Sequence, residues 1–154
     1  ATNANRTLHD WFTDGTYKAR ASIATLANAM DVGAPSNFER LASFEPDAAV
    51  DVIRVSDDEI QNTIRQEFER SGYVACPHTA TALRAHDRLD SAVRDQRPWL
   101  IGATAHPYKF RETIEPLIAQ KITAPAPLAA VLERDTRVAD ITPDLRALKA
   151  ALAG

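Results

Sequence analysis

Apolar side chains recur at helical spacing over most of the chain. Leu8, Trp11 and Phe12 lie at positions i, i+3 and i+4, and the turn signal Asp14-Gly15 ends that run. The same spacing returns repeatedly, so most of the predicted elements are helices. In chain order, helices are predicted over residues 8–12, 23–30, 38–41, 57–71, 79–89 and 107–118, with a last one that begins at 143.

Short polar signals mark where several of these helices begin. Ser36 and Glu39 have the spacing of a capping box, in which each side chain bonds a free backbone N–H at the other's position. Ser56 and Glu59 repeat that spacing, and the acidic residues between them favour a helix N-terminus. Thr142 is the predicted N-cap of the last helix.

Two short apolar runs between helices predict β-strands. The first covers residues 73–76 and stops at Pro77. The second, residues 99–103, is apolar without alternation, as expected of a strand covered on both faces. Residues 43–55 show neither period and predict an irregular connection. Strands separated by helices predict an α/β fold with short parallel strands flanked by helices.

Composition and charge narrow the possible partners. The chain of 154 residues is long enough for a domain with its own core, and its net charge of −3 disfavours a nucleic-acid partner. No apolar run reaches the roughly 18 residues of a membrane span, and no secretory signal is found. The single cysteine, Cys76, favours a reducing compartment, which we take to be the cytoplasm. The five glycines stand too far apart for a phosphate-binding glycine loop.

The junction between the second predicted strand and the next helix is the leading candidate site. In open α/β sheets, ligands bind outside the carboxyl ends of the strands. Thr104 stands at such an end with a hydroxyl that can donate or accept, and Gly102 would let a flat ring approach. Thr104 can equally cap the helix, with His106 as a loop residue. Lys109 adjoins the apolar stripe at Phe110, so a solvent-facing lysine is favoured over a Schiff-base lysine.

Other polar groups carry weaker signals. Cys76, His78 and His86 match no standard zinc spacing and have no fourth ligand in sight, so no metal site is predicted. Asn3 and Asn5, at i and i+2, can offer hydrogen bonds to a ligand. Asparagine in such positions also suits a simple turn, and the sequence leaves both roles open.

Several segments resemble, in the same order, the later half of threonine synthase. The most specific is Thr104-Ala105-His106-Pro107, followed by Lys109-Phe110. The resemblance begins at Ala1 and fades after Ile118. The other segments that carry it are residues 1–5, 28–32, 36–41, 72–73 and 77–80.

This resemblance implies a pyridoxal-phosphate enzyme of fold type II, the tryptophan-synthase-β type, with residues 1–154 forming the C-terminal part of its catalytic region. It implies conversion of O-phospho-L-homoserine and water to L-threonine and phosphate. In that family the threonine of the Thr-Ala-His-Pro motif lies beside the pyridine nitrogen of pyridoxal 5'-phosphate, and the resemblance implies the same position for Thr104. Substrate contacts are expected from polar residues of this chain, namely Asn3, Asn5, Asp31, Asn37 and His106.

The chain also departs from the family pattern. The family's Schiff-base lysine and cofactor-phosphate loop lie upstream of Ala1, so the chain alone is expected to be inactive. Cys76 stands where the family usually has an acidic residue before Pro-His, and the connection over residues 43–55 is short. Two alternatives therefore stay open: a non-catalytic binding or interaction module on the same scaffold, and a related pyridoxal-phosphate lyase acting on amino acids.

Overall fold

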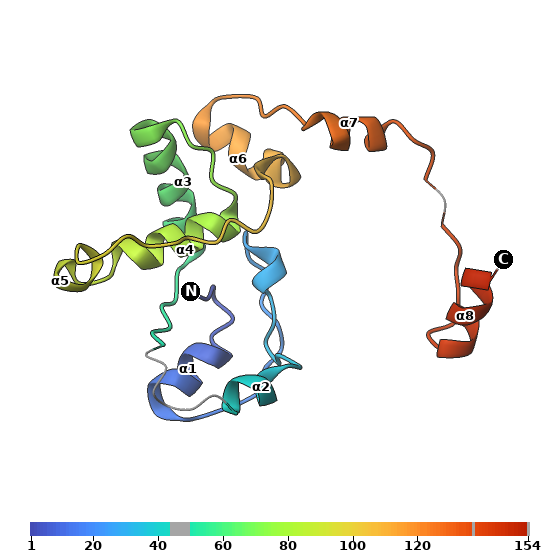
Figure 1. The fold of residues 1–154 in the computed structure, drawn as a ribbon, viewed down its shortest axis with the longest axis horizontal. Helices are drawn as coiled ribbons and strands as arrows, with labels where there is room; N and C mark the ends of the chain where they lie inside the picture. The colour runs from blue at the N-terminus through green and yellow to red at the C-terminus, as the bar shows by residue number, and fades with distance from the viewer. Residues whose placement is uncertain (44–49, 137, 154) are drawn as a thin grey trace. The chain divides into compact units, whose positions relative to one another are not determined.

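The computed structural model describes residues 1–43, 50–136 and 138–153. Helices dominate these ranges, and the chain divides into two compact units, Ala1–Ile122 and Thr123–Gly154 (Figure 1). In chain order the elements are α1 (Thr7–Asp14), the 3-10 turn η1 (Asn28–Met30), α2 (Phe38–Ala42), α3 (Asp57–Ser71), α4 (Pro77–Asp87), α5 (Ser91–Arg94), the 3-10 turn η2 (Pro107–Phe110), α6 (Arg111–Ile118), α7 (Ala126–Leu132) and α8 (Leu145–Ala153).

The predicted α/β fold with parallel strands is wrong for the described residues. They contain no β-strand, and their β-pairing consists of one isolated parallel bridge between Thr2 and Arg54. At that bridge the Thr2 amide donates to the Ile53 carbonyl at 2.8 Å, and the Val55 amide donates to the Thr2 carbonyl at 2.8 Å. The bridge holds the start of the chain against the segment that leads into α3.

The two apolar runs fail as strands because a strand needs a neighbour to bond its backbone. No backbone hydrogen bond joins residues 99–103 to another segment within the described ranges. Leu100 there is 100% exposed, so the expected cover on both faces is absent from that part of the structure. The run over 73–76 is likewise coil, although Ala75 and Cys76 are buried.

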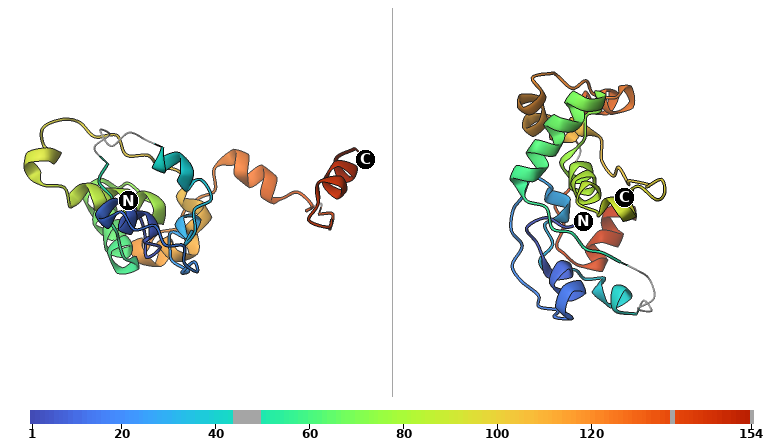
Figure 2. Two further views of the ribbon diagram at one scale, coloured as in Figure 1. Left: turned by 90° about the horizontal axis from the view of Figure 1, so that it is seen from below. Right: turned by 90° about the vertical axis from the view of Figure 1, so that its left-hand side faces the viewer.

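The hydrophobic core lies where α3, α4 and α6 meet. α3 packs against both other helices, and Figures 1 and 2 show the three gathered at one end of the first unit, with α1 at the other. The stripe predicted on α3 faces this core, with Ile60 and Ile64 fully buried. The core residues are Ala27, Val55, Ile60, Ile64, Ala75, Cys76, Ala80, Phe110, Ile114 and Ile118.

Local signals fix the ends of several helices. The capping box of Ser56 and Glu59 is formed, and Gly15 and Gly72 end α1 and α3 in the left-handed conformation. The other predicted box is not formed, because α2 starts after Asn37 with no side-chain cap.

Two further predictions need correction. The predicted helix over residues 23–30 is reduced to η1. The predicted cap Thr142 bonds the Asp144 carboxylate instead, and Asp144 accepts the Ala147 amide at 2.8 Å. Of the predicted connection over 43–55, residues 44–49 lie outside the described residues.

The second unit carries α7 and α8. The leucines of α8 are exposed, Leu145 by 65% and Leu152 by 78%. Among the described residues of the whole chain, every helix is too short or too polar to cross a membrane.

Candidate functional site

Three of the predicted site residues meet in one hydrogen-bond network near the N-terminus. The amide nitrogen of Asn3 donates to the Asp31 carboxylate at 2.7 Å, and that of Asn5 donates to the same oxygen at 3.1 Å. Asn5 also donates to the side-chain oxygen of Asn3 at 3.0 Å. Thr25 completes the network, since its backbone N–H and its hydroxyl bond the two Asp31 oxygens at 2.9 and 2.7 Å.

The two asparagines of the network are buried, and their hydrogen-bonding atoms are in use. Asn3 is 1% exposed and Asn5 is 7% exposed. The oxygen of Asn5 accepts the Ile23 amide at 2.8 Å while its nitrogen donates to the Ile23 carbonyl at 2.8 Å. These bonds pin the extended segment around Ile23 and Thr25 to the start of the chain. The arrangement favours a positioning role for the three residues, because few of their polar atoms are left for a ligand.

His78, on α4, also contacts the segment that the network holds. It lies in the first turn of α4, is 8% exposed, and its Nε2 accepts the Ala29 amide at 3.0 Å. Its ring packs against Phe110 with centroids 5.0 Å apart. Burial lowers the pKa of His78, nearby Lys109 lowers it further, and Asp31 opposes both effects. The histidine is therefore neutral, and since Nε2 accepts, its proton is on Nδ1.

Thr104 and His106 lie apart from that network, in the turn before η2, and both are exposed. His106 is the N-cap of η2, since its Nδ1 accepts the Tyr108 amide at 3.2 Å. The alternative in which Thr104 caps this helix is therefore wrong. Within the described residues the Thr104 hydroxyl has no hydrogen-bond partner, so it is free for a ligand. Lys109 is exposed, and its nitrogen lies 5.5 Å from the centre of the Phe110 ring.

Asn37, the remaining predicted contact, is exposed at the start of α2 and makes no capping hydrogen bond. It adjoins a small aromatic cluster. Phe38 stacks on Tyr17 with centroids 3.9 Å apart and meets Trp11 edge-on at 4.9 Å. The structure therefore brings together Asn3, Asn5 and Asp31, but not Asn37, Thr104 or His106.

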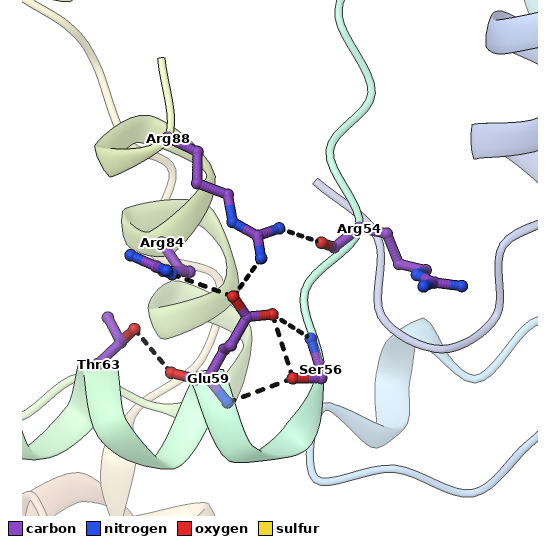
Figure 3. Close-up of polar contacts among 6 residues, drawn as sticks. All are labelled: Arg54, Ser56, Glu59, Thr63, Arg84 and Arg88. Carbon is purple, nitrogen blue, oxygen red and sulfur yellow. Dashed lines mark hydrogen bonds and ion pairs between the residues drawn. The ribbon is translucent and has the colours of Figure 1, made fainter. Parts of the chain in front are cut away.

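A second polar cluster surrounds Glu59 at the start of α3 (Figure 3). Its carboxylate accepts the Ser56 amide at 3.0 Å and bonds Arg88 and Arg84, the latter at 3.3 Å. The Ser56 amide is the largest cause of the lowered pKa of Glu59, with Arg84 and Arg88 adding to it. The cluster joins α3 to α4. The capping box predicts Glu59, but sequence spacing cannot predict partners 25 and 29 residues away.

Cys76 has a structural role at the start of α4. It is the N-cap of α4, and its sulfur accepts the Thr79 amide at 3.4 Å. No group of three or more His, Cys, Asp or Glu residues within the described ranges is arranged to hold a metal ion.

Comparison with known proteins gives these residues a context. The family model described as "Threonine synthase, C-terminal" matches residues 79–152. Threonine synthase from Serratia marcescens is 36% identical over 134 residues, which cover 84% of this chain and 30% of that protein. The crystal structure of threonine synthase from Escherichia coli aligns with 99% of this chain and 36% of its own, at a TM-score of 0.72 and 32% identity. The chain matches the C-terminal portion of the threonine synthases.

A pyridoxal-phosphate-bound threonine synthase from Brucella melitensis has the same fold, with a TM-score of 0.75 over 99% of this chain and 39% of its own, at 22% identity. The chain spans about a third of the length of the threonine synthases that it matches. The match also extends to residue 152, beyond Ile118, where the motif resemblance fades.

The role of His78 is not predicted by the sequence. No metal site is expected there, and the structure gives its ring a contact with the Ala29 backbone. His78 lies within residues 77–80, one of the segments that resemble threonine synthase. Its place after Pro77 in the first turn of α4 allows its ring to bond another backbone segment. The partner, Ala29, is 49 residues away in sequence, so local spacing cannot identify it.

Proposed function

We propose that this chain is the C-terminal part of a pyridoxal-phosphate-dependent threonine synthase, which converts O-phospho-L-homoserine and water to L-threonine and phosphate. The observation that carries the proposal is the similarity to the Escherichia coli threonine synthase, which extends over 99% of this chain. The ordered motifs from Ala1 to Phe110 agree with it. We place the reaction in the cytoplasm, in keeping with the single cysteine.

Thr104 is the residue that would meet the cofactor. Its exposed hydroxyl has no partner in the described structure, which fits a group that must bond the pyridine nitrogen. When bound, pyridoxal phosphate supplies an electron sink that stabilises carbanions on the substrate. A hydroxyl can donate to that nitrogen or accept from it, so unlike a carboxylate it does not force the nitrogen to stay protonated. The few, scattered glycines of this chain do not fit the cofactor's phosphate group.

The five candidate substrate residues fall into two groups. Asn37 and His106 are exposed and keep polar atoms free, so we propose them as direct substrate contacts. Asn3, Asn5 and Asp31 are proposed to act through position, because their bonds hold the segment from Ile23 to Asp31 in place. A positioning residue of this kind affects substrate binding by shifting backbone rather than by losing a contact.

The proposal is tested on the full-length protein with purified substrates. We expect phosphate release from O-phospho-L-homoserine and formation of threonine, with neither serine nor threonine consumed at a comparable rate. The absorbance of bound pyridoxal phosphate reports cofactor binding separately. If the protein binds no cofactor and releases no phosphate, the proposed function is wrong. Consumption of serine or threonine instead would favour the related lyase.

The role of Thr104 has its own test. Thr104→Val removes the hydroxyl at nearly constant volume and should reduce turnover by roughly tenfold, the effect of one lost hydrogen bond. Thr123→Val, at another exposed threonine, is the matched control and should behave as the unchanged protein. Equal turnover of the two variants would remove Thr104 from the site while leaving the proposed function standing.

A further inference from the structure

A largely apolar pocket lies beside α4 and α5 in the first unit. It encloses about 510 Å³, and its wall includes Leu89, Val93, Trp99 and Leu100. Ala1 also belongs to that wall, so the start of the chain lies at the pocket. Contiguous apolar surface of this kind marks an interaction site.

Several large side chains of this wall are exposed. Leu100 is 100% exposed, Val93 44% and Trp99 39%. The backbone of residues 99–103 makes no hydrogen bond to another segment within the described ranges. Contact between water and large apolar side chains is unfavourable, so a partner that covers them would stabilise the folded protein.

Contacts around Trp99 hold this wall in place. The indole Nε1 donates to the Arg94 carbonyl at 2.8 Å, and the guanidinium carbon of Arg97 lies 5.3 Å from the centre of the indole ring. The ring of His86 on α4 meets the indole edge-on, with centroids 5.8 Å apart. Leu100 follows directly, so it is exposed on a segment that is tied to α4.

The relatives indicate which partner could cover the wall. The alignment with the Escherichia coli threonine synthase includes 99% of this chain but 36% of that one, and the matching family model describes a C-terminal part. Under the proposed function, most of the protein therefore precedes Ala1. That preceding segment would join the chain at the wall of the pocket. A segment tethered so closely meets the pocket at a high effective concentration.

We propose that this pocket is the docking site for an apolar face of the segment that precedes Ala1 in the full-length protein. The proposal rests on the proposed function for one point, the position of this chain at the end of a longer protein. The interface also bears on the candidate site, since Thr104 follows Leu100 in the same coil segment. Docking at Leu100 fixes the backbone that carries the Thr104 hydroxyl.

Thiol labelling of the full-length protein with a maleimide tests the proposal. Leu100→Cys places a thiol in the pocket wall. Asp95→Cys is the control in the same segment, at a side chain that is 64% exposed and outside the described lining of the pocket. Each labelling rate is compared with that of the same variant unfolded in urea. We expect the Leu100→Cys thiol to react at least about tenfold more slowly in the folded protein, and the Asp95→Cys thiol to react similarly in both states.

The labelling has one background signal within this chain. Cys76 is buried and is common to both variants, so the rate measured on the unchanged protein is subtracted from each.

Urea unfolding gives a second measurement that needs no added thiol. Leu100→Ala should lower the unfolding midpoint of the full-length protein by roughly 0.5 M, because it truncates a covered side chain. Leu152→Ala, at a leucine that is 78% exposed, is the matched control and should leave the midpoint unchanged. An unchanged midpoint in Leu100→Ala would contradict the docking.

Two labelling results would overturn the proposal. One is an equal rate for Leu100→Cys in the folded and the unfolded protein, which would show that the pocket is open. The other is protection that disappears on dilution, since this would assign the pocket to a second copy of the protein. Neither measurement depends on activity. Phosphate release by a protein whose Leu100→Cys thiol is unprotected would refute the docking alone, and protection without cofactor binding or phosphate release would refute the proposed function alone.

Discussion

Two groups of polar residues in the first unit use their hydrogen-bonding atoms in opposite ways. Asn3, Asn5 and Asp31 are bonded to one another and to the backbone of the following segment. Thr104 and His106 are exposed, and the Thr104 hydroxyl has no partner in the described structure. Both groups lie in segments that resemble threonine synthase. The contrast separates polar motif residues that fix the backbone from those whose polar atoms are left for a ligand.

The two roles have different energetic signatures. A buried network that loses one member leaves donors without partners, and the cost appears in the free energy of unfolding. An exposed hydroxyl returns to water when its ligand is absent, so its loss scarcely changes stability. Stability and turnover measured on the same variants therefore separate the two groups.

Asp31→Ala should have the largest effect on stability. The carboxylate accepts hydrogen bonds from Asn3, Asn5 and both donors of Thr25, and the substitution leaves these donors without their acceptor. We expect the free energy of unfolding to fall by about 3 kcal/mol. Urea unfolding of the full-length protein, followed by tryptophan fluorescence, measures the change.

Asp135→Ala is the control for that measurement, since Asp135 is an exposed carboxylate of the second unit. It should change stability by less than about 0.5 kcal/mol. A matching, small loss in both variants would mean that the Asp31 network does not hold the fold.

The two glycines Gly33 and Gly102 offer a second comparison, which depends on the space around each residue and not on hydrogen bonds. A Cβ at Gly33 would lie 2.9 Å from the Ala21 carbonyl carbon and closer still to the Arg20 carbonyl oxygen, so backbone must move. Nothing lies within 4 Å of a Cβ at Gly102. We expect Gly33→Ala to lower the free energy of unfolding by about 2 kcal/mol and Gly102→Ala to leave it unchanged within about 0.5 kcal/mol. Similar unfolding midpoints for the two variants would contradict the close approach at Gly33.

The elements that could be predicted from sequence are those whose determinants are local. The helix α3 has its cap, stripe and terminal glycine within one stretch, and all three are confirmed. The run over 99–103 has the composition of a strand, but pairing depends on a neighbour that no local pattern reveals. The helix predicted over 23–30 fails for a related reason. Its backbone is bonded by the side chains of Asn5 and Asp31, which compete with helical hydrogen bonds.

Three residues of the hydrogen-bond network, Asn3, Asn5 and Asp31, could be singled out from the sequence, but their contacts could not. The spacing of Asn3 and Asn5 drew attention to both residues, and the structure joins them to Asp31. Their partners Thr25 and Asp31 lie 22 to 28 residues away, so only folding brings the donors and acceptors together. A still longer separation of 49 residues hides the bond between His78 and the Ala29 amide from sequence analysis.

His78 should make the stability of the folded chain depend on pH. Burial lowers its pKa in the folded protein from the ordinary value of 6.5. Below pH 6.5 the unfolded chain therefore takes up a proton that the folded chain resists, so stability falls as the pH falls through that value. His78→Gln should reduce this acid sensitivity between pH 7 and about pH 5, because glutamine does not titrate. His106→Gln, at an exposed histidine, should keep it, and identical pH profiles for the two variants would contradict the buried role of His78.

Thr104→Val should have the smallest effect on stability, within about 0.5 kcal/mol of the unchanged protein. The hydroxyl is exposed and bonds no described residue, so the folded chain loses nothing when it is removed. The variant is informative because its unchanged stability is compared with the roughly tenfold loss of turnover that contact with the cofactor predicts. A large loss of stability would move Thr104 into the group of Asn3, Asn5 and Asp31. A loss of turnover at unchanged stability would instead place it with the residues that act on a ligand.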